Sequence, residues 1–242
     1  MTGNEPRIRI TRELFDAVIF DLDGVITKTA KVHAAAWKEL FDGFLRERAQ
    51  RQGKEFEAFD IEQDYREYVD GKPRYQGVQS FLASRGIDLP YGDTEDDPDQ
   101  ETICGLGNKK NALFRERLKK DGVEVYEHAA DFLQKLRQNG FKTAIVSSSK
   151  NCTAVLEAVG LLQQFDAQVD GVVSEKIGLQ GKPDPDMYNI ARDISQADPA
   201  RSVYIDDRAL FVEIAQGMGI HGIHHTDVES TRKRLKELGL EA

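Results

Sequence analysis

A short apolar run that ends in two acidic residues constrains this chain more than any other feature. Residues 17–20 read Ala-Val-Ile-Phe, which suits a strand that is buried on both faces of a sheet. Asp21 comes where that strand should end, Asp23 follows two residues later, and Gly24 permits a sharp turn. Because an unpaired buried charge is costly, we expect a divalent cation there, and carboxylate oxygens favour Mg²⁺. Two solvated aspartates in a loop are the simpler alternative.

Polar residues also follow two later strand candidates. Residues 142–146 lead into Ser147, and residues 203–205 lead into the acidic pair Asp206-Asp207. Lys182 stands between them in a turn that two prolines keep out of helix and sheet. A serine hydroxyl can hold a phosphate oxygen, and a lysine ammonium can neutralise charge between phosphate and carboxylates. Because the strand ends of a parallel α/β sheet converge on one crevice, we expect these groups to meet there.

The apolar period changes to that of a helix after residue 27. An amphipathic helix is expected from about residue 30 to residue 52, where Gly53 ends it. Three further helices are expected, at about 61–69, 77–84 and 108–120. Residues 90–101 are acidic and turn-rich, as in a solvated surface loop. We therefore expect residues 28–125 to form a helical cap domain.

Strands and helices alternate again from residue 127 onward, with a strand expected at 169–173. Such alternation is typical of a parallel sheet with helices on both faces. The sequence thus predicts a core domain of residues 1–27 and 126–242, into which the cap is inserted.

The composition narrows the range of functions. The net charge of -9 argues against a nucleic-acid surface. No apolar run approaches the ~20 residues of a membrane span, and residues 1–7 lack the apolar region of a signal peptide. We therefore expect a cytoplasmic monomer with no nucleic-acid or membrane partner. Two cysteines are too few for a disulfide framework, and the His-rich residues 221–225 lack the partners of a zinc site.

As an ordered set, these motifs resemble those of the haloacid dehalogenase superfamily, and within it those of the β-phosphoglucomutase-like proteins. The matching stretches are Asp21-Leu-Asp-Gly-Val25, residues 27–37, Gly71-Lys-Pro-Arg74, Asn108-Lys-Lys-Asn111, residues 146–151, Lys182 and Asp206-Asp207. The resemblance implies a Rossmann-like α/β core with an inserted helical cap. It also implies an Mg²⁺-dependent enzyme of carbohydrate metabolism that acts on a small phosphorylated sugar.

The resemblance further implies a role for each core motif. Asp21 would be the nucleophile that forms an aspartyl-phosphate, and Asp23 would be the general acid and base. Ser147 and Lys182 would hold the phosphoryl oxygens, with Ser148 and Ser149 beside them. The expected metal ligands are Asp21, the backbone carbonyl of Asp23, and Asp207, with Asp206 acting through water or toward Lys182.

In the cap, the resemblance implies that Arg74, which follows Gly71 in a loop, binds a second, non-reacting phosphate. A surface salt bridge is the alternative for Arg74. Lys110 would face the substrate. His33 would help to set the position of Asp23, unless it only makes a structural hydrogen bond. Thr29 is a further substrate-binding candidate, or only a helix N-cap.

Three departures from the mutase-like pattern keep two activities open. Lys28 and Asp70 stand where those proteins usually carry an acid and a lysine, and the motif that begins at Asp206 is more like that of phosphatases. One hypothesis is an isomerase that passes phosphate between C1 and C6 of a sugar through a bisphosphate. The other is a phosphatase, in which water attacks the aspartyl-phosphate. A non-enzymatic phosphate-binding regulator is disfavoured, because every catalytic position carries competent chemistry.

Overall fold

The computed structural model describes residues 14–240 and divides the chain into two compact units. The core unit contains the residues up to Thr27 and those from Val125 onward, and the cap unit is Lys28–Glu124. Val125, which the sequence analysis placed in the cap, forms a bridge with Thr27 in the core unit. Residues 1–7, on which the signal-peptide prediction rests, lie outside the described residues. Within residues 14–240, no helix combines the length and apolar character needed to cross a membrane.

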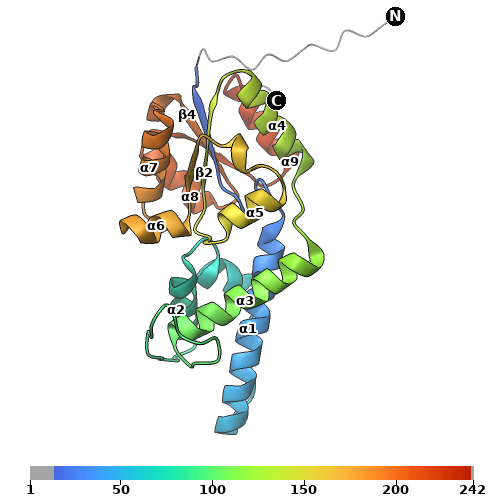
Figure 1. Cartoon of the computed structure of the whole chain (residues 1–242), viewed down its shortest axis with the longest axis vertical. Coiled ribbons are helices and arrows are strands. Elements are labelled where there is room, and N and C mark those ends of the chain that lie inside the picture. Colours follow the sequence, from blue (N-terminus) through green and yellow to red (C-terminus); the bar gives the residue numbers. More distant parts are fainter. Residues whose placement is uncertain (1–13, 241–242) are drawn as a thin grey trace, which may run out of the picture. The chain divides into compact units, whose positions relative to one another are not determined.

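The core unit is built on a five-stranded sheet in which every pair of neighbouring strands is parallel (Figure 1). The strand order is β3-β2-β1-β4-β5, so the first strand of the chain lies in the centre. The strands are β1 (Ala17–Phe20), β2 (Lys142–Val146), β3 (Ala167–Val169), β4 (Ser202–Asp206) and β5 (His221–His224). This sheet confirms the predicted α/β fold.

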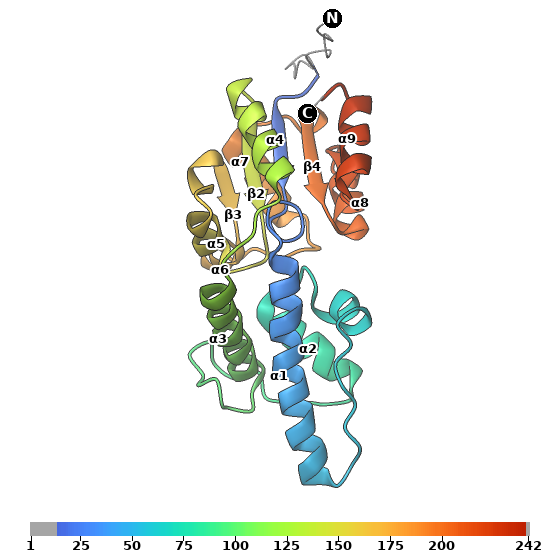
Figure 2. The ribbon, with the colours of Figure 1, turned by 90° about the vertical axis from the view of Figure 1, so that its right-hand side faces the viewer.

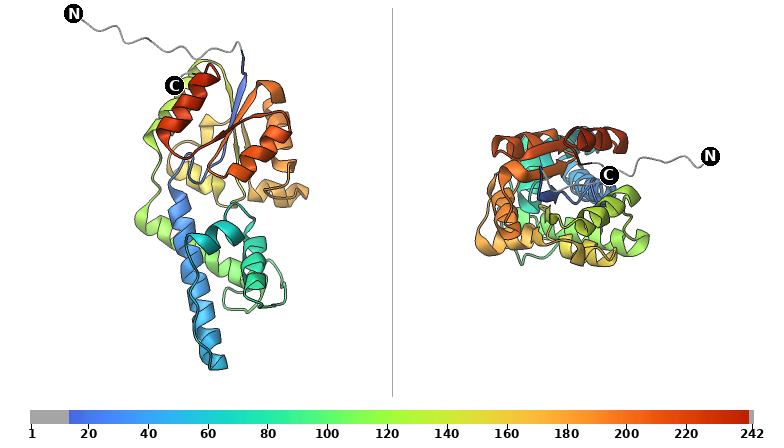
Figure 3. Two further views of the ribbon diagram at one scale, coloured as in Figure 1. Left: turned by 180° about the vertical axis from the view of Figure 1, so that it is seen from behind. Right: turned by 90° about the horizontal axis from the view of Figure 1, so that it is seen from above.

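Helices cover both faces of this sheet (Figures 2 and 3). They are α4 (Glu127–Gln138), α5 (Cys152–Ala158), α6 (Gly171–Ile177), α7 (Asp186–Ser195), α8 (Ala209–Gly217) and α9 (Val228–Glu237). Successive strand residues point to opposite faces. Ile19 and Tyr204 accordingly pack in one cluster with residues of α7 and α8, whereas Phe20 and Ile205 line a pocket with residues of α4 and α9. Burial on both faces explains why β1 is apolar at every position.

The structure corrects the strand predicted at 169–173. The strand β3 ends at Val169, and α6 begins at Gly171. Asp170 is the N-cap of this helix, since its Oδ1 accepts hydrogen bonds from the backbone amides of Val172 and Val173 at 3.0 and 2.9 Å. The cap residue overrides the strand preference of the two valines.

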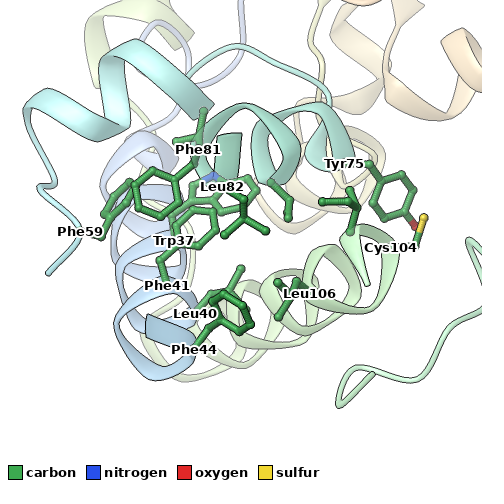
Figure 4. Close-up of a cluster of buried hydrophobic side chains, with 13 residues drawn as sticks. Trp37, Leu40, Phe41, Phe44, Phe59, Tyr75, Phe81, Leu82, Cys104 and Leu106 are labelled. Atoms are coloured by element: carbon green, nitrogen blue, oxygen red, sulfur yellow. The ribbon is translucent and has the colours of Figure 1, made fainter. Parts of the chain in front are cut away.

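The cap unit contains the helices α1 (Thr29–Gln52), α2 (Arg74–Ser84) and α3 (Ile103–Asp121), with a π-helical turn at Tyr65–Val69. The three helices bury an aromatic cluster that includes Trp37, Phe41 and Phe81 (Figure 4). Gly53 ends α1 in the left-handed conformation, as predicted. Lys28, and not Thr29, occupies the N-cap position of α1, so the N-cap interpretation of Thr29 is wrong.

Two cap helices begin earlier than the sequence predicted, α2 at residue 74 instead of 77 and α3 at residue 103 instead of 108. Pro73 stands just before α2, where its missing amide costs no helical hydrogen bond. Thr102 caps α3, because its Oγ1 accepts a hydrogen bond from the backbone amide of Gly105 at 2.9 Å. The first turn of α3 is rich in glycine, so the sequence predicted its start too late.

The packing of α8 against β5 depends on Gly222. A Cβ at this position would lie 2.5 Å from Val212 Cγ1 and 2.9 Å from Gln216 Cγ. We expect Gly222→Ala to lower the free energy of unfolding by about 1–3 kcal/mol through overpacking. Gly217 has open space around its Cα, so Gly217→Ala should raise stability slightly, by about 0.5–1 kcal/mol. Urea denaturation followed by circular dichroism measures both changes, and equal effects would contradict the packing argument.

Candidate active site

The central strands bring three carboxylates together at one end of the core sheet. Asp21 follows β1 and Asp206 ends β4, and these strands pair in parallel register with Phe20 opposite Ile205. The backbone amide of Asp21 donates to the Ile205 carbonyl at 2.9 Å. As a result, one carboxylate oxygen from each of Asp21, Asp206 and Asp207 lies within 4.8 Å of the other two.

Lys182 lies buried between two of these carboxylates. Its Nζ is 2.5 Å from Asp21 Oδ1 and 2.9 Å from Asp206 Oδ2, and its side chain is only 2% exposed. Burial by itself would lower the pKa of Lys182, but the two carboxylates outweigh it and raise that pKa above its usual value. The ammonium group is therefore a permanent positive charge next to Asp21. The predicted meeting of Asp21, Lys182 and the Asp206-Asp207 pair is present in the structure.

Both oxygens of Asp206 are held by hydrogen bonds. Oδ2 accepts from Lys182 and from the Tyr204 hydroxyl, and Oδ1 accepts from the backbone amide of Arg208 at 2.8 Å. Tyr204 was not among the residues predicted from the sequence, although residues two apart on a strand point to the same face. Burial raises the pKa of Tyr204, and the negative charge of Asp206 raises it further. Tyr204 therefore stays protonated and donates to Asp206.

Asp207 lies close to the backbone of the first motif. A Cβ on Gly24 would be 2.3 Å from Asp207 Oδ2, and the φ of Gly24 is +90°. Only glycine satisfies both conditions, which gives Gly24 a second role besides the turn. Asp206 is already held by three donors, and an oxygen of Asp207 lies within 4.8 Å of carboxylate oxygens of Asp21 and Asp206.

The serine motif also reaches this end of the sheet. Ser147 follows β2, the other neighbour of β1, and is buried. Its Oγ accepts a hydrogen bond from the backbone amide of Ser149 at 3.1 Å, while Ser148 and Ser149 are half-buried. Asp23 is half-buried as well and lies near enough to Asp21 to raise its pKa.

The charges around Asp21 fit a divalent cation. Burial raises the pKa of Asp21 well above its usual value; Lys182 opposes this shift, whereas Asp206, Asp207 and Asp23 add to it. An ionised Asp21 thus needs more positive charge than Lys182 supplies. Clustered carboxylate oxygens, with no sulfur or imidazole ligand among the three residues, suit Mg²⁺.

The buried Lys110 contacts the half-buried His33 within the cap. Lys110 is 4% exposed, and its Nζ lies 2.5 Å from His33 Nδ1 and about 5 Å from the ring centres of Trp37 and Phe114. The His33 ring stacks on Phe114 with 4.0 Å between centroids. Burial lowers the pKa of His33 well below its usual value, and the Lys110 charge lowers it further. His33 is therefore neutral and accepts a hydrogen bond from Lys110.

Arg74 is the first residue of α2, three residues after Gly71, which has a positive φ of 72°. Its Nη2 donates to Tyr75 Oη at 3.0 Å and to Asn108 Oδ1 at 3.3 Å. These partners are a phenol and an amide and not a carboxylate, so the salt-bridge alternative for Arg74 finds no support. Thr29, the remaining candidate in the cap, is buried in the first turn of α1.

Removing the Lys182 ammonium should destabilise the core. We expect Lys182→Met to lower the free energy of unfolding by about 3–5 kcal/mol in EDTA, because Asp21 and Asp206 then face each other without compensation. Adding Asp206→Asn should restore part of this loss. The exposed Lys176 offers a matched control, for which Lys176→Met should change stability by less than about 0.5 kcal/mol. Urea denaturation of the four proteins tests this, and similar losses for both lysines would contradict it.

His33 should make stability depend on pH. Its pKa is lowered from 6.5 in the folded protein, so below pH 6.5 the unfolded chain binds a proton that the folded chain does not. Stability should therefore fall on acidification, by up to about 1.4 kcal/mol per pH unit from this group. His33→Gln keeps an acceptor for Lys110 and should remove that part of the slope. The exposed His221→Gln should keep the wild-type slope in urea denaturation between pH 7.5 and 5.5.

Comparison with known proteins places this geometry in a family. A sequence profile of haloacid dehalogenase-like hydrolases matches residues 15–219. The chain is 42% identical over 191 residues to β-phosphoglucomutases of Mycobacterium tuberculosis and Mycobacterium bovis, a match that covers 79% of this chain and 73% of each relative. It is also 35% identical to an uncharacterised glycosyl hydrolase of Mycobacterium tuberculosis, over 100% of this chain but 18% of that protein.

The fold agrees with these matches. The crystal structure of a β-phosphoglucomutase from Clostridium difficile has a TM-score of 0.68 to this chain at 20% identity, and the alignment covers 92% of this chain and 98% of that one. The profile match extends over most of the sequence and includes every motif of the acidic site. The chain is thus an enzyme that belongs to the haloacid dehalogenase-like hydrolase family.

Proposed function

We propose that this enzyme transfers a phosphoryl group of a small sugar phosphate through an aspartyl-phosphate on Asp21. The observation that carries the proposal is the buried contact of Lys182 with Asp21 and Asp206 beside Asp207. Carboxylates are weak nucleophiles, and a fixed positive charge lets one approach an anionic phosphate. Asp21, Asp207 and the Asp23 backbone carbonyl would hold Mg²⁺, which supplies further positive charge that makes the phosphorus more electrophilic.

Residues of the core unit would also carry out the bond changes and proton transfers. An Asp21 oxygen forms a bond to phosphorus while the bond from phosphorus to the sugar oxygen breaks. Asp23 gives its proton to that leaving oxygen and then takes a proton from the incoming hydroxyl, which attacks the aspartyl-phosphate and frees Asp21. Lys182 and Ser147 hold the phosphoryl oxygens through both transfers. Tyr204 and the Arg208 amide keep Asp206 oriented toward Lys182.

The acceptor of the phosphoryl group separates a mutase from a phosphatase. We favour the mutase, in which a sugar hydroxyl accepts the group and a bisphosphate is the intermediate. Arg74 supports this choice, because a guanidinium whose partners are neutral retains its full charge for a second phosphate. The 42% identity to proteins named β-phosphoglucomutase supports it as well. The Asp206-Asp-Arg208 motif favours the alternative, a sugar-phosphate phosphatase.

Phosphorus NMR of the purified enzyme distinguishes the two activities. With Mg²⁺, β-glucose 1-phosphate and a trace of glucose 1,6-bisphosphate, we expect glucose 6-phosphate without inorganic phosphate. Release of inorganic phosphate would establish the phosphatase instead. Asp21→Asn removes the nucleophile and should abolish either reaction, as should EDTA, and retained turnover in both cases would refute the covalent, metal-dependent mechanism.

A further inference from the structure

Asn108 in α3 connects Arg74 to the acidic loop of residues 90–101. Its Oδ1 accepts hydrogen bonds from Arg74 Nη2 at 3.3 Å and from the Tyr75 hydroxyl at 2.9 Å. Its Nδ2 donates to the backbone carbonyls of Thr94 and Asp96 at 3.0 and 2.9 Å. Turning the amide over would place its oxygen against two carbonyl oxygens, so the network fixes which end faces Arg74.

Two glycines allow this network to form. A Cβ on Gly105 would lie 2.3 Å from the backbone carbonyl oxygen of Gln100, and a Cβ on Gly107 would lie 2.5 Å from Tyr75 Cδ1. The loop and the Tyr75 ring therefore lie directly against α3. These two glycines made the start of α3 hard to predict from the sequence. They also let Asn108 contact both the loop and Tyr75.

The same network holds Arg74 without neutralising it. Its guanidinium carbon lies 4.9 Å from the centre of the Tyr75 ring, and Nη2 is taken by Tyr75 and Asn108. Nε is buried and has no hydrogen-bond partner among residues 14–240. The acidic loop presents backbone carbonyls to Asn108, while the Asp96 carboxylate accepts from Thr102 Oγ1 at 2.6 Å. Arg74 is thus oriented in advance by neutral groups, which lowers the entropy cost of binding an anion.

We propose that Tyr75 and Asn108 are positioning residues that hold the Arg74 guanidinium for the non-reacting phosphate of a sugar bisphosphate. This inference rests on the proposed function. In it, the loop of residues 90–101 holds the Asn108 side chain in place through the backbone carbonyls of Thr94 and Asp96. Substrates with a second phosphate should depend on this network. Substrates with a single phosphate at the reacting position should not.

The test compares glucose 1,6-bisphosphate, which carries a second phosphate, with p-nitrophenyl phosphate, which does not. We expect Tyr75→Phe to raise KM for the bisphosphate by about tenfold, with kcat little changed, because one hydrogen bond to a charged group is lost. Asn108→Asp places a carboxylate on Arg74 and should raise that KM further. For both variants, kcat/KM with p-nitrophenyl phosphate should stay within about twofold of wild type. Tyr68→Phe, a half-buried tyrosine elsewhere in the cap, should change neither substrate.

Arg74→Ala, measured in the same assays, separates the positioning role of Tyr75 and Asn108 from the proposed function. A selective loss with Arg74→Ala but not with Tyr75→Phe and Asn108→Asp would overturn the positioning role and leave the proposed function in place. A loss that is equal for both substrates in Tyr75→Phe and Asn108→Asp would also overturn it, because misfolding affects both reactions alike. If Arg74→Ala itself shows no selectivity, Arg74 does not bind the second phosphate. The positioning role then fails and the mutase loses the support of Arg74, whereas phosphoryl transfer through Asp21 is tested separately by Asp21→Asn.

Discussion

The contact of one buried ammonium with two buried carboxylates is the constraint on which the core depends. Lys182 comes from a turn before α7, Asp21 follows β1 and Asp206 ends β4, so the three meet only when β1 and β4 pair and the turn lies against their ends. Each charge alone would be too costly to bury. The sheet order that puts β1 in the centre is therefore also the arrangement that brings the reacting group and its counter-charge together.

The candidate site residues of the two units differ in the charge of their neighbours. The core gathers more carboxylates around Asp21 than Lys182 can neutralise, which leaves a local excess of negative charge that suits a metal ion. The cap holds Lys110 against a neutral imidazole and aromatic rings, and Arg74 against a phenol and an amide. In these contacts Lys110 and Arg74 meet neutral groups, whereas Lys182 in the core meets two carboxylates.

The sequence predicted features that depend on neighbours along the chain. Buried strands show as apolar runs, and Gly53 ends α1 because its left-handed conformation is a local property. The errors fall where a single capping side chain decides the structure, as with Asp170 before α6 and Thr102 before α3. The role of Asn108 could not be predicted in this way. Its partners Arg74 and Tyr75 lie 34 and 33 residues before it, and Thr94 and Asp96 lie 14 and 12 residues before it. Only the folded cap brings these groups to one amide.

The acidic site alone therefore does not decide between a mutase and a phosphatase. Forming and breaking an aspartyl-phosphate requires the same core residues whether water or a sugar hydroxyl attacks. What differs is the gain from holding the intermediate by its second phosphate while the sugar turns, since a retained bisphosphate returns its other phosphate to Asp21. Under the proposed function, the Arg74 guanidinium would provide that hold, and a simple hydrolase would gain little from it. The loop, the two glycines and the amide orient Arg74 in the way that the proposed mutase would require.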